Sequence, residues 1–252
     1  MIKLYQFALS HFCEKARWAL DYKSIPYTPV NLLPGLHAKP IRKLAPKTCM
    51  PALVDEKTAV QDSAAIITYL DKMHPDPLLT PRDAREAKEA LDWEKYFDEE
   101  IGVTLRLWFY YHTLPDRGRA MKFIMTGAPW YGPPLFAVIF PKVREAMTKL
   151  LRINAESAKD AEERLIAALD RLDDALKDRR FLVGDRFSRP DLAACALLSP
   201  LLLPTEKEAV ELFPRAVRAF RERHKGRACF TWAKNVYDNY RQPMAATIKA
   251  AA

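Results

Sequence analysis

The chain has 252 residues, which is enough for one large domain or two of ordinary size. Its composition, 49% hydrophobic and 29% charged residues, is typical of a folded globular protein and disfavours disorder. A net charge of +8 favours small anionic ligands. Lys and Arg nevertheless alternate with Asp and Glu along the chain, so the charge pattern disfavours a dedicated nucleic-acid binder.

The cysteines are too dispersed to indicate a metal site or a disulfide framework. The four of them are Cys13, Cys49, Cys195 and Cys229. They form no metal-ligand spacing with the five histidines, so we expect no metal. The N-terminus lacks the long apolar stretch of a signal peptide, and the longest apolar run, 192–203, contains a proline and is too short for a membrane span. These features predict a cytoplasmic protein.

The first 77 residues have the pattern of an α/β unit. Alternating apolar and polar residues predict strands, whereas apolar residues three or four positions apart predict helices. The expected elements are strand 2–7, helix 12–22, strand 26–30, a short helix 40–44, strands 52–54 and 58–60, and a helix 64–73 capped by Ser63. This order predicts a mixed sheet. Prolines at positions 75 and 77 end the unit, and a linker follows to about residue 81.

Residues 84–252 have the pattern of an all-helical domain. Amphipathic spacing predicts a long helix over 83–112, helical structure over 142–177, and helices over 191–203, 207–213, 214–224 and 230–241. A stretch rich in Gly, Pro and aromatic residues, 126–134, is expected to interrupt the helices. Apolar and aromatic residues over 126–141 suit either a hydrophobic ligand pocket or an ordinary core.

The segment Ser10-His11-Phe12-Cys13 lies where the first strand meets the first helix. A helix N-terminus favours a nearby thiolate, and the Ser10 hydroxyl could donate a hydrogen bond to one. Cys13 could itself have a lowered pKa there. The alternatives are a simple helix cap for Ser10 and a small packed residue for Cys13.

The segment Asp62-Ser63 opens the last helix of the α/β unit. The Ser63 hydroxyl and the first N–H groups of that helix could hold a carboxylate, while Asp62 could face an ammonium group. An ordinary helix cap with an acidic neighbour is the alternative. Because Ser63 could cap and bind at once, the two interpretations are compatible.

These segments resemble the glutathione S-transferase family. Residues 10–17 resemble its S-P-F-x-x-[RK]-[VA]-[RK] signature, with His11 in place of proline, and also the C-x-x-C segment of glutaredoxins with Ser10 in place of the first cysteine. Residues 46–53 resemble its stretch ending in V-P-A-L, and residues 181–191 resemble its F-L-x-G-x-x-x-S-x-A-D signature. In that last segment Ser188 and Asp191 predict a capping box.

The resemblance implies a thioredoxin-like α/β domain, 1–77, that binds glutathione, and an all-α helical bundle, 84–252, that forms the electrophile site. It implies that Ser10 activates the glutathione thiol, with Cys13 as a second catalytic candidate, and that Pro51 follows a cis peptide bond. The implied glutathione contacts are Phe12, Lys39, Met50, Pro51, Asp62 and Ser63. Lys39 belongs to a segment, His37–Pro40, that could equally be a solvated loop.

The leading hypothesis is a glutathione transferase that joins the thiolate of its co-substrate glutathione to a small hydrophobic electrophile. One alternative is a glutathione-dependent thiol-disulfide reductase or isomerase that uses Cys13. Another is a non-catalytic glutathione-binding or scaffold protein of the same fold. The resemblance also implies a homodimer.

Overall fold

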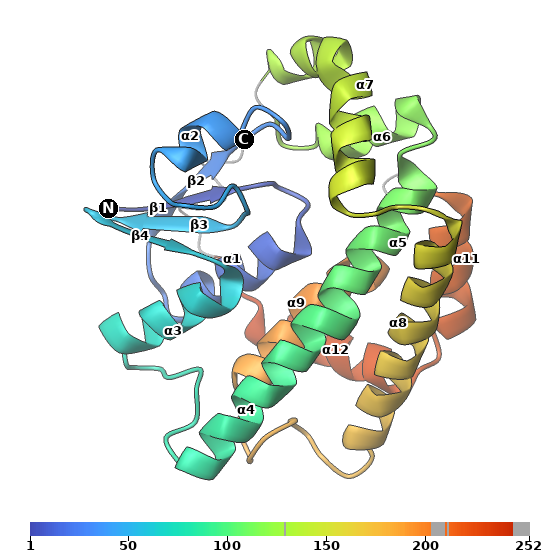
Figure 1. Ribbon diagram of the computed structural model, residues 1–252. Helices are drawn as coiled ribbons and strands as arrows, with labels where there is room; N and C mark the ends of the chain where they lie inside the picture. The colour runs from blue at the N-terminus through green and yellow to red at the C-terminus, as the bar shows by residue number, and fades with distance from the viewer. Residues whose placement is uncertain (129, 203–209, 211, 244–252) are drawn as a thin grey trace.

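The computed structural model describes residues 1–128, 130–202, 210 and 212–243 (Figure 1). Four strands form one mixed sheet in the order β2-β1-β3-β4. The strands are β1 (Ile2–Gln6), β2 (Tyr27–Asn31), β3 (Ala52–Asp55) and β4 (Thr58–Gln61). β1 pairs in parallel with β2 and antiparallel with β3, so the expected mixed sheet is confirmed.

Three helices complete the α/β unit, namely α1 (His11–Tyr22), α2 (Ala38–Arg42) and α3 (Ser63–Met73). The apolar face of α1 includes Trp18, Ala19 and Leu20, which are fully buried. They form one core cluster with Leu4 of β1 and Leu70 of α3, and that cluster continues into the helical domain. The expected elements of this unit are all present, with boundaries shifted by one or two residues.

The rest of the described chain is helical. Its elements are α4 (Ala84–Phe97), a π-helical segment η1 (Asp98–Val103), α5 (Thr104–Thr113), α6 (Arg117–Ile124), α7 (Gly132–Leu150), α8 (Ala155–Ala175), α9 (Arg189–Leu202), α11 (Arg215–His224) and α12 (Ala228–Tyr240). In Figure 1, α4 and α5 follow one another along a single long rod beside α8. The fold is thus a thioredoxin-like domain followed by a helical domain, as expected.

Three helix predictions need correction. The expected helix 83–112 contains the π-helical turn η1, and the expected segment 142–177 is two helices, because Asn154 and Ser157 form a capping box that starts α8. The interruption expected over 126–134 is present between α6 and α7 but ends earlier, because α7 begins at Gly132. Pro133 and Pro134 occupy the first turn of α7, where proline removes no helical hydrogen bond. Helix α6 was not anticipated, and the expected helix 207–213 lies largely outside the described residues.

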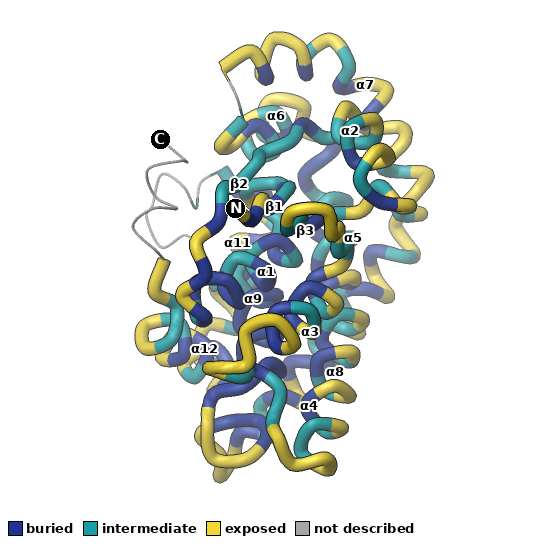
Figure 2. The backbone as a smooth tube through the Cα atoms, turned by 90° about the vertical axis from the view of Figure 1, so that its left-hand side faces the viewer, coloured by how far each residue is buried: buried dark blue, intermediate teal, exposed yellow. Residues whose placement is uncertain are grey.

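Helix α9 joins the two domains. It lies at the centre of the molecule, and Figure 2 shows it buried behind α1. Its Leu192 and Cys195 belong to the core cluster of the α/β domain, whereas its Leu197 and Leu198 belong to that of the helical domain. At its start Asp191 accepts hydrogen bonds from Leu182 N at 2.9 Å and Ser188 N at 2.9 Å. The bond from Ser188 N to the Asp191 carboxylate is the one that the predicted capping box requires of Asp191, and the Ser188 hydroxyl also donates to Asp191 at 3.1 Å.

Candidate active site

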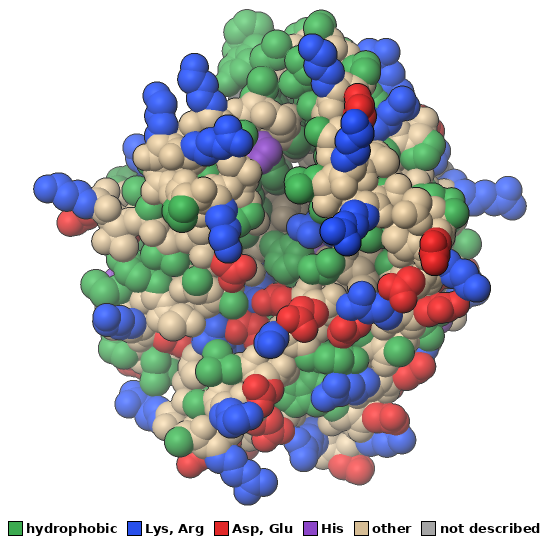
Figure 3. Space-filling view, in the orientation of Figure 1, with side chains coloured by type: hydrophobic (Ala, Val, Ile, Leu, Met, Phe, Trp, Pro, Cys, Tyr) green, Lys and Arg blue, Asp and Glu red, His purple; other side chains and the backbone are tan. Residues whose placement is uncertain are grey.

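A cavity of about 630 Å³ lies between the two domains. Its α/β wall consists of the loop between β1 and α1, the first residues of α1, the loop between β2 and α2, and residues 48–50. Its other wall consists of residues from α5, α6 and α7. Figure 3 shows a hollow on this face, between the α/β domain and the helices. Most of the lining is apolar, which suits a hydrophobic ligand.

Ser10 caps α1 and also lines the cavity. Its side-chain oxygen accepts a hydrogen bond from Cys13 N at 3.4 Å, and its backbone carbonyl accepts one from Glu14 N at 2.8 Å. The same hydroxyl also carries a proton that it can donate, either to the neighbouring Cys13 sulfur or to a group in the cavity. Both interpretations drawn from the sequence, a helix cap and a hydrogen-bond donor to a ligand, are compatible with this geometry.

Cys13 lies beneath the cavity wall and does not line the cavity. It is fully buried, and burial raises its pKa more than the nearby Arg17 and the Ser10 hydroxyl lower it. A thiol in this position stays protonated and inaccessible, whereas a reactive cysteine needs thiolate character and exposure. The geometry therefore favours the packed role of Cys13 over the catalytic one.

His11 links α1 to the helical domain. Its Nε2 lies 2.9 Å from the carbonyl oxygen of Gly102 in η1; a carbonyl only accepts, so Nε2 carries a proton and donates this hydrogen bond. Burial and, to a lesser extent, the nearby Arg106 lower its pKa to about 4 although the bond to Gly102 raises it, so the ring is neutral. The family signature has proline at this position, and proline could not make such a bond. The substitution thus has a structural consequence that the sequence did not reveal.

The Met50–Pro51 peptide bond is cis, as the resemblance implied. Met50 lines the cavity next to Cys49. The Pro51 carbonyl accepts a hydrogen bond from Asp62 N at 3.3 Å, which ties this loop to the start of α3. Residues before β3 and residues at the N-terminus of α3 are thereby brought together.

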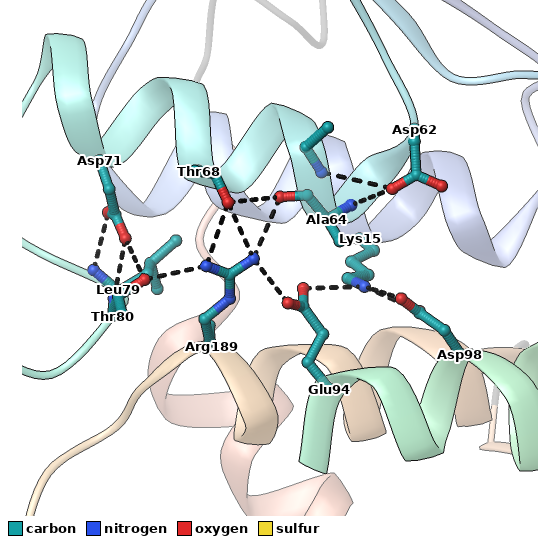
Figure 4. Close-up of polar contacts among 11 residues, drawn as sticks. Lys15, Asp62, Ala64, Thr68, Asp71, Leu79, Thr80, Glu94, Asp98 and Arg189 are labelled. Carbon is teal, nitrogen blue, oxygen red and sulfur yellow. Dashed lines mark hydrogen bonds and ion pairs between the residues drawn. The ribbon is translucent and has the colours of Figure 1, made fainter. Parts of the chain in front are cut away.

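The expected cap on Ser63 is wrong. Asp62 is the N-cap of α3, with φ of 82°, and its Oδ1 accepts hydrogen bonds from Ala64 N at 2.9 Å and Ala65 N at 3.3 Å (Figure 4). Ser63 is the first helical residue. Its hydroxyl oxygen is buried and has no hydrogen-bond partner. A buried hydroxyl without a partner is costly. Neither Asp62 nor Ser63 is among the residues that line the cavity.

Of the two basic residues near the start of α2, Lys39 and His37, only His37 lines the cavity. Lys39 is exposed on α2 and does not line the cavity. His37 does line it, packs edge-on against Phe7 with ring centroids 4.9 Å apart, and accepts a hydrogen bond from Gly35 N at 3.1 Å. Phe12, the remaining predicted contact, lines the cavity next to Ser10 and is half-buried.

Sequence reasoning missed the cavity residues of α5. Leu105, Arg106, Phe109 and Tyr110 line the cavity, and their spacing of three and four positions places them on one face of the helix. The sequence shows this spacing. It does not show which face of the helix meets the α/β domain.

Two family models match the chain. One is described as the N-terminal domain of glutathione S-transferase and matches residues 4–78; the other is described as its C-terminal domain and matches residues 130–227. Together they match more than half of the 252 residues. The chain belongs to the glutathione S-transferase family.

Relatives and solved structures of glutathione S-transferases agree with this. The chain is 40% identical over 96 residues to glutathione S-transferase Z1 of Arabidopsis thaliana, a match that covers 37% of this chain and 42% of that protein. It is 22% identical over 201 residues to a probable glutathione S-transferase of Nicotiana tabacum, covering 77% and 68%. The matched segment thus spans less than half the length of the Arabidopsis protein.

Two solved structures share the fold. The beta-etherase LigF of Sphingobium is 19% identical, with a TM-score of 0.63, and the match covers 93% of this chain and 98% of that one. A glutathione S-transferase of Methylobacterium radiotolerans, solved in complex with glutathione sulfonate, is 21% identical with a TM-score of 0.59, covering 91% and 92%. At these identities the two matches establish the architecture alone.

Within the described part of the chain, no three His, Cys, Asp or Glu side chains are grouped so that they could hold a metal ion. None of the helices described is both long enough and apolar enough to cross a bilayer.

Proposed function

We propose that this protein is a glutathione transferase that joins the thiolate of glutathione to a hydrophobic electrophile. The observation that carries the proposal is one cavity shared by Ser10, Met50 and the apolar residues of α5 and α7. A site that binds a peptide thiol on one wall and an apolar molecule on the other supplies the proximity on which conjugation depends.

Ser10 has the role of stabilising the thiolate. The glutathione sulfur would lie near the N-terminus of α1, whose free N–H groups and dipole favour negative charge. The Ser10 hydroxyl would donate a hydrogen bond to the sulfur and so lower the pKa of the thiol. The thiolate then attacks the electrophilic carbon. A sulfur–carbon bond forms, and the leaving group departs with its electron pair.

The γ-glutamyl end of glutathione would be held at the start of α3. The buried Ser63 hydroxyl lacks a partner and could donate to a carboxylate. The Asp62 carboxylate uses Oδ1 for the helix cap, and its Oδ2 makes no hydrogen bond to another described residue, so it could accept from an ammonium group. Backbone groups of Met50 would pair with the middle of the ligand as a strand would.

Steady-state conjugation of glutathione to chlorodinitrobenzene tests the proposal. Ser10→Ala should lower kcat/KM about 10- to 100-fold, the usual worth of a hydrogen bond to a charged group. Cys13→Ala should change it less than about threefold, because Cys13 is buried away from the cavity. Equal activity in Ser10→Ala and the unaltered protein would overturn the assignment. Loss in Cys13→Ala alone would favour the thiol reductase.

We further propose a homodimer in the cytoplasm. The dimer is typical of the family, and Met73 of α3 and Leu91 of α4 expose apolar side chains that a partner could cover. The four free cysteines suit a reducing compartment. Sedimentation velocity of the unaltered protein and of Leu91→Glu checks the dimer, because a charge at the interface should shift the protein to monomer.

A further inference from the structure

Arg106 is a half-buried cation on the α5 wall of the cavity. Its Nε is buried and has no hydrogen-bond partner. Its guanidinium carbon lies 5.6 Å from the centre of the Phe12 ring, which is two residues after Ser10. Arg106 therefore borders the part of the cavity where the α1 N-terminus meets the helical domain.

No carboxylate among the described residues neutralises Arg106. Burial lowers its pKa, and the groups that act against this effect are Tyr110 and Cys49, neither of which is a carboxylate. Two other arginines with little exposure are paired with carboxylates: Arg189 lies 2.5 Å from Glu94, and Arg227 lies 2.7 Å from Asp173. Burying an unpaired cation is costly. An anionic ligand would offset that cost.

A second donor lies one turn further along the same helix face. Tyr110 follows Arg106 by four residues and also lines the cavity. Burial raises the pKa of its phenol, which therefore keeps its proton. The guanidinium fork and a phenol hydroxyl together match the two oxygens of a carboxylate. The neighbouring Leu105 and Phe109 offer apolar contact only.

We propose that Arg106 and Tyr110 form a carboxylate subsite, and that the preferred electrophiles carry a carboxylate on an apolar body. The inference rests on the proposed function and specifies its substrate class. The conjugation step is unchanged: the glutathione sulfur bonds to the electrophilic carbon and the leaving group departs with its electron pair. The carboxylate takes no part in that exchange and serves to orient the electrophile.

Two electrophiles that differ in charge test the subsite. Chlorodinitrobenzoate and chlorodinitrobenzamide both lose chloride to a thiolate, but only the benzoate is anionic. Arg106→Gln should lower kcat/KM for the benzoate about 10- to 100-fold relative to the amide. Arg106→Lys should retain part of the preference for the benzoate, because lysine keeps the positive charge but lacks the paired N–H donors of the guanidinium group. Arg144→Gln removes an equal charge from the exposed surface of α7 and should change neither value by more than about twofold.

The carboxylate could instead belong to glutathione, and the same variants separate the two sources. If Arg106 serves the electrophile, KM for glutathione in Arg106→Gln stays unchanged with both electrophiles. A rise in that KM, equal with benzoate and amide, would assign the guanidinium to glutathione and overturn the proposal. Equal kcat/KM for both electrophiles in the unaltered protein would also overturn it.

If the protein shows no transferase activity, measurements of ligand binding can still test the carboxylate subsite. Absence of conjugation with both electrophiles and with chlorodinitrobenzene would refute the transferase activity alone. Calorimetry with dinitrobenzoate and dinitrobenzamide, which lack a leaving group, then tests the subsite. The unaltered protein should bind the benzoate at least about tenfold more tightly, and Arg106→Gln should abolish that difference. No difference in the unaltered protein would refute the subsite.

Discussion

At the scale of single residues, His11 shows how burial changes what a side chain can do. The ring is neutral, donates to Gly102 across the domain junction, and has a pKa lowered to about 4 by burial. Because the folded-state pKa lies below the unfolded value of 6.5, the folded state resists protonation. The associated stability is complete above pH 6.5 and is lost as pH falls through about 4.

His11→Gln keeps a donor for Gly102 and removes the titration. We expect the free energy of unfolding of the unaltered protein to fall relative to His11→Gln by about 3 kcal/mol on acidification from pH 6.5 to below pH 4. Urea denaturation at a series of pH values measures this difference. Parallel pH profiles for the two proteins would show that His11 is not the titrating group.

A second prediction at the scale of single residues concerns the Ser63 hydroxyl. Ser63→Ala removes a buried hydroxyl that has no partner, so stability should be unchanged or rise by up to about 1 kcal/mol. Glutathione affinity, measured by calorimetry, should fall about tenfold. Ser157→Ala is the matched control: its hydroxyl belongs to the capping box of α8, so this variant should lose about 1 kcal/mol of stability and keep its glutathione affinity. Unchanged affinity in Ser63→Ala would remove Ser63 from the site.

At the scale of elements, the π-helical segment η1 lets the helical domain approach α1. A Cβ on Gly102 would lie 2.5 Å from Cζ of Phe12 and 3.0 Å from Cδ2 of Leu197. Gly102 thus leaves room for Phe12 at the edge of the cavity while its carbonyl accepts from His11. The π-helical segment η1 therefore lies where the two domains are in contact.

Gly102→Ala should displace Phe12 and destabilise the protein by about 1–3 kcal/mol, the usual cost of overpacking. Adding Phe12→Leu should recover most of that loss, because the smaller side chain vacates the clash. Gly118→Ala is the control in helix α6, where an added Cβ would make only an ordinary contact with Asp116 Oδ1 at 3.5 Å, so alanine should stabilise by up to about 1 kcal/mol. Guanidinium denaturation compares the variants. An additive effect in the double variant would contradict the proposed clash.

At the scale of the whole molecule, a buried ionic network joins the two domains (Figure 4). Lys15 of α1 lies 2.9 Å from Glu94 and 2.7 Å from Asp98, and Arg189 of α9 lies 2.5 Å from Glu94. Burial raises the pKa of Asp98 to about 6 although Lys15 lowers it. Each charge in this junction therefore depends on a partner from a distant part of the sequence.

Lys15→Met should destabilise the protein by about 3–5 kcal/mol, because it leaves Asp98 without its cation and Glu94 with Arg189 alone. Lys15→Met with Asp98→Leu should be less damaging than the single change, since the carboxylate that lost its partner is also removed. Guanidinium denaturation of the two variants and of Asp98→Leu alone gives the coupling energy. A coupling near zero would mean that the pair contributes nothing beyond its separate side chains.

The sequence by itself determined the element order, the helix start at Ser10, the family and the pairing of Ser188 with Asp191. These features depend on residues close together along the chain, where apolar spacing and capping side chains act locally. Even there, Asp62 rather than Ser63 caps α3, because two neighbouring residues can both serve as caps and backbone geometry selects one. Prolines at 133 and 134 likewise allow a helix to start where an interruption was expected.

Only the tertiary structure decided which of these residues share a cavity. Burial raises the pKa of Cys13 and keeps its thiol out of the cavity, although its place in the signature suggested reactivity. The packing of the domains also places Arg106 on a cavity wall, where no described residue supplies a carboxylate to it. Solvent access and electrostatic pairing arise from contacts between residues nearly a hundred positions apart, as between His11 and Gly102. No local pattern specifies such contacts, because they depend on how the two domains pack.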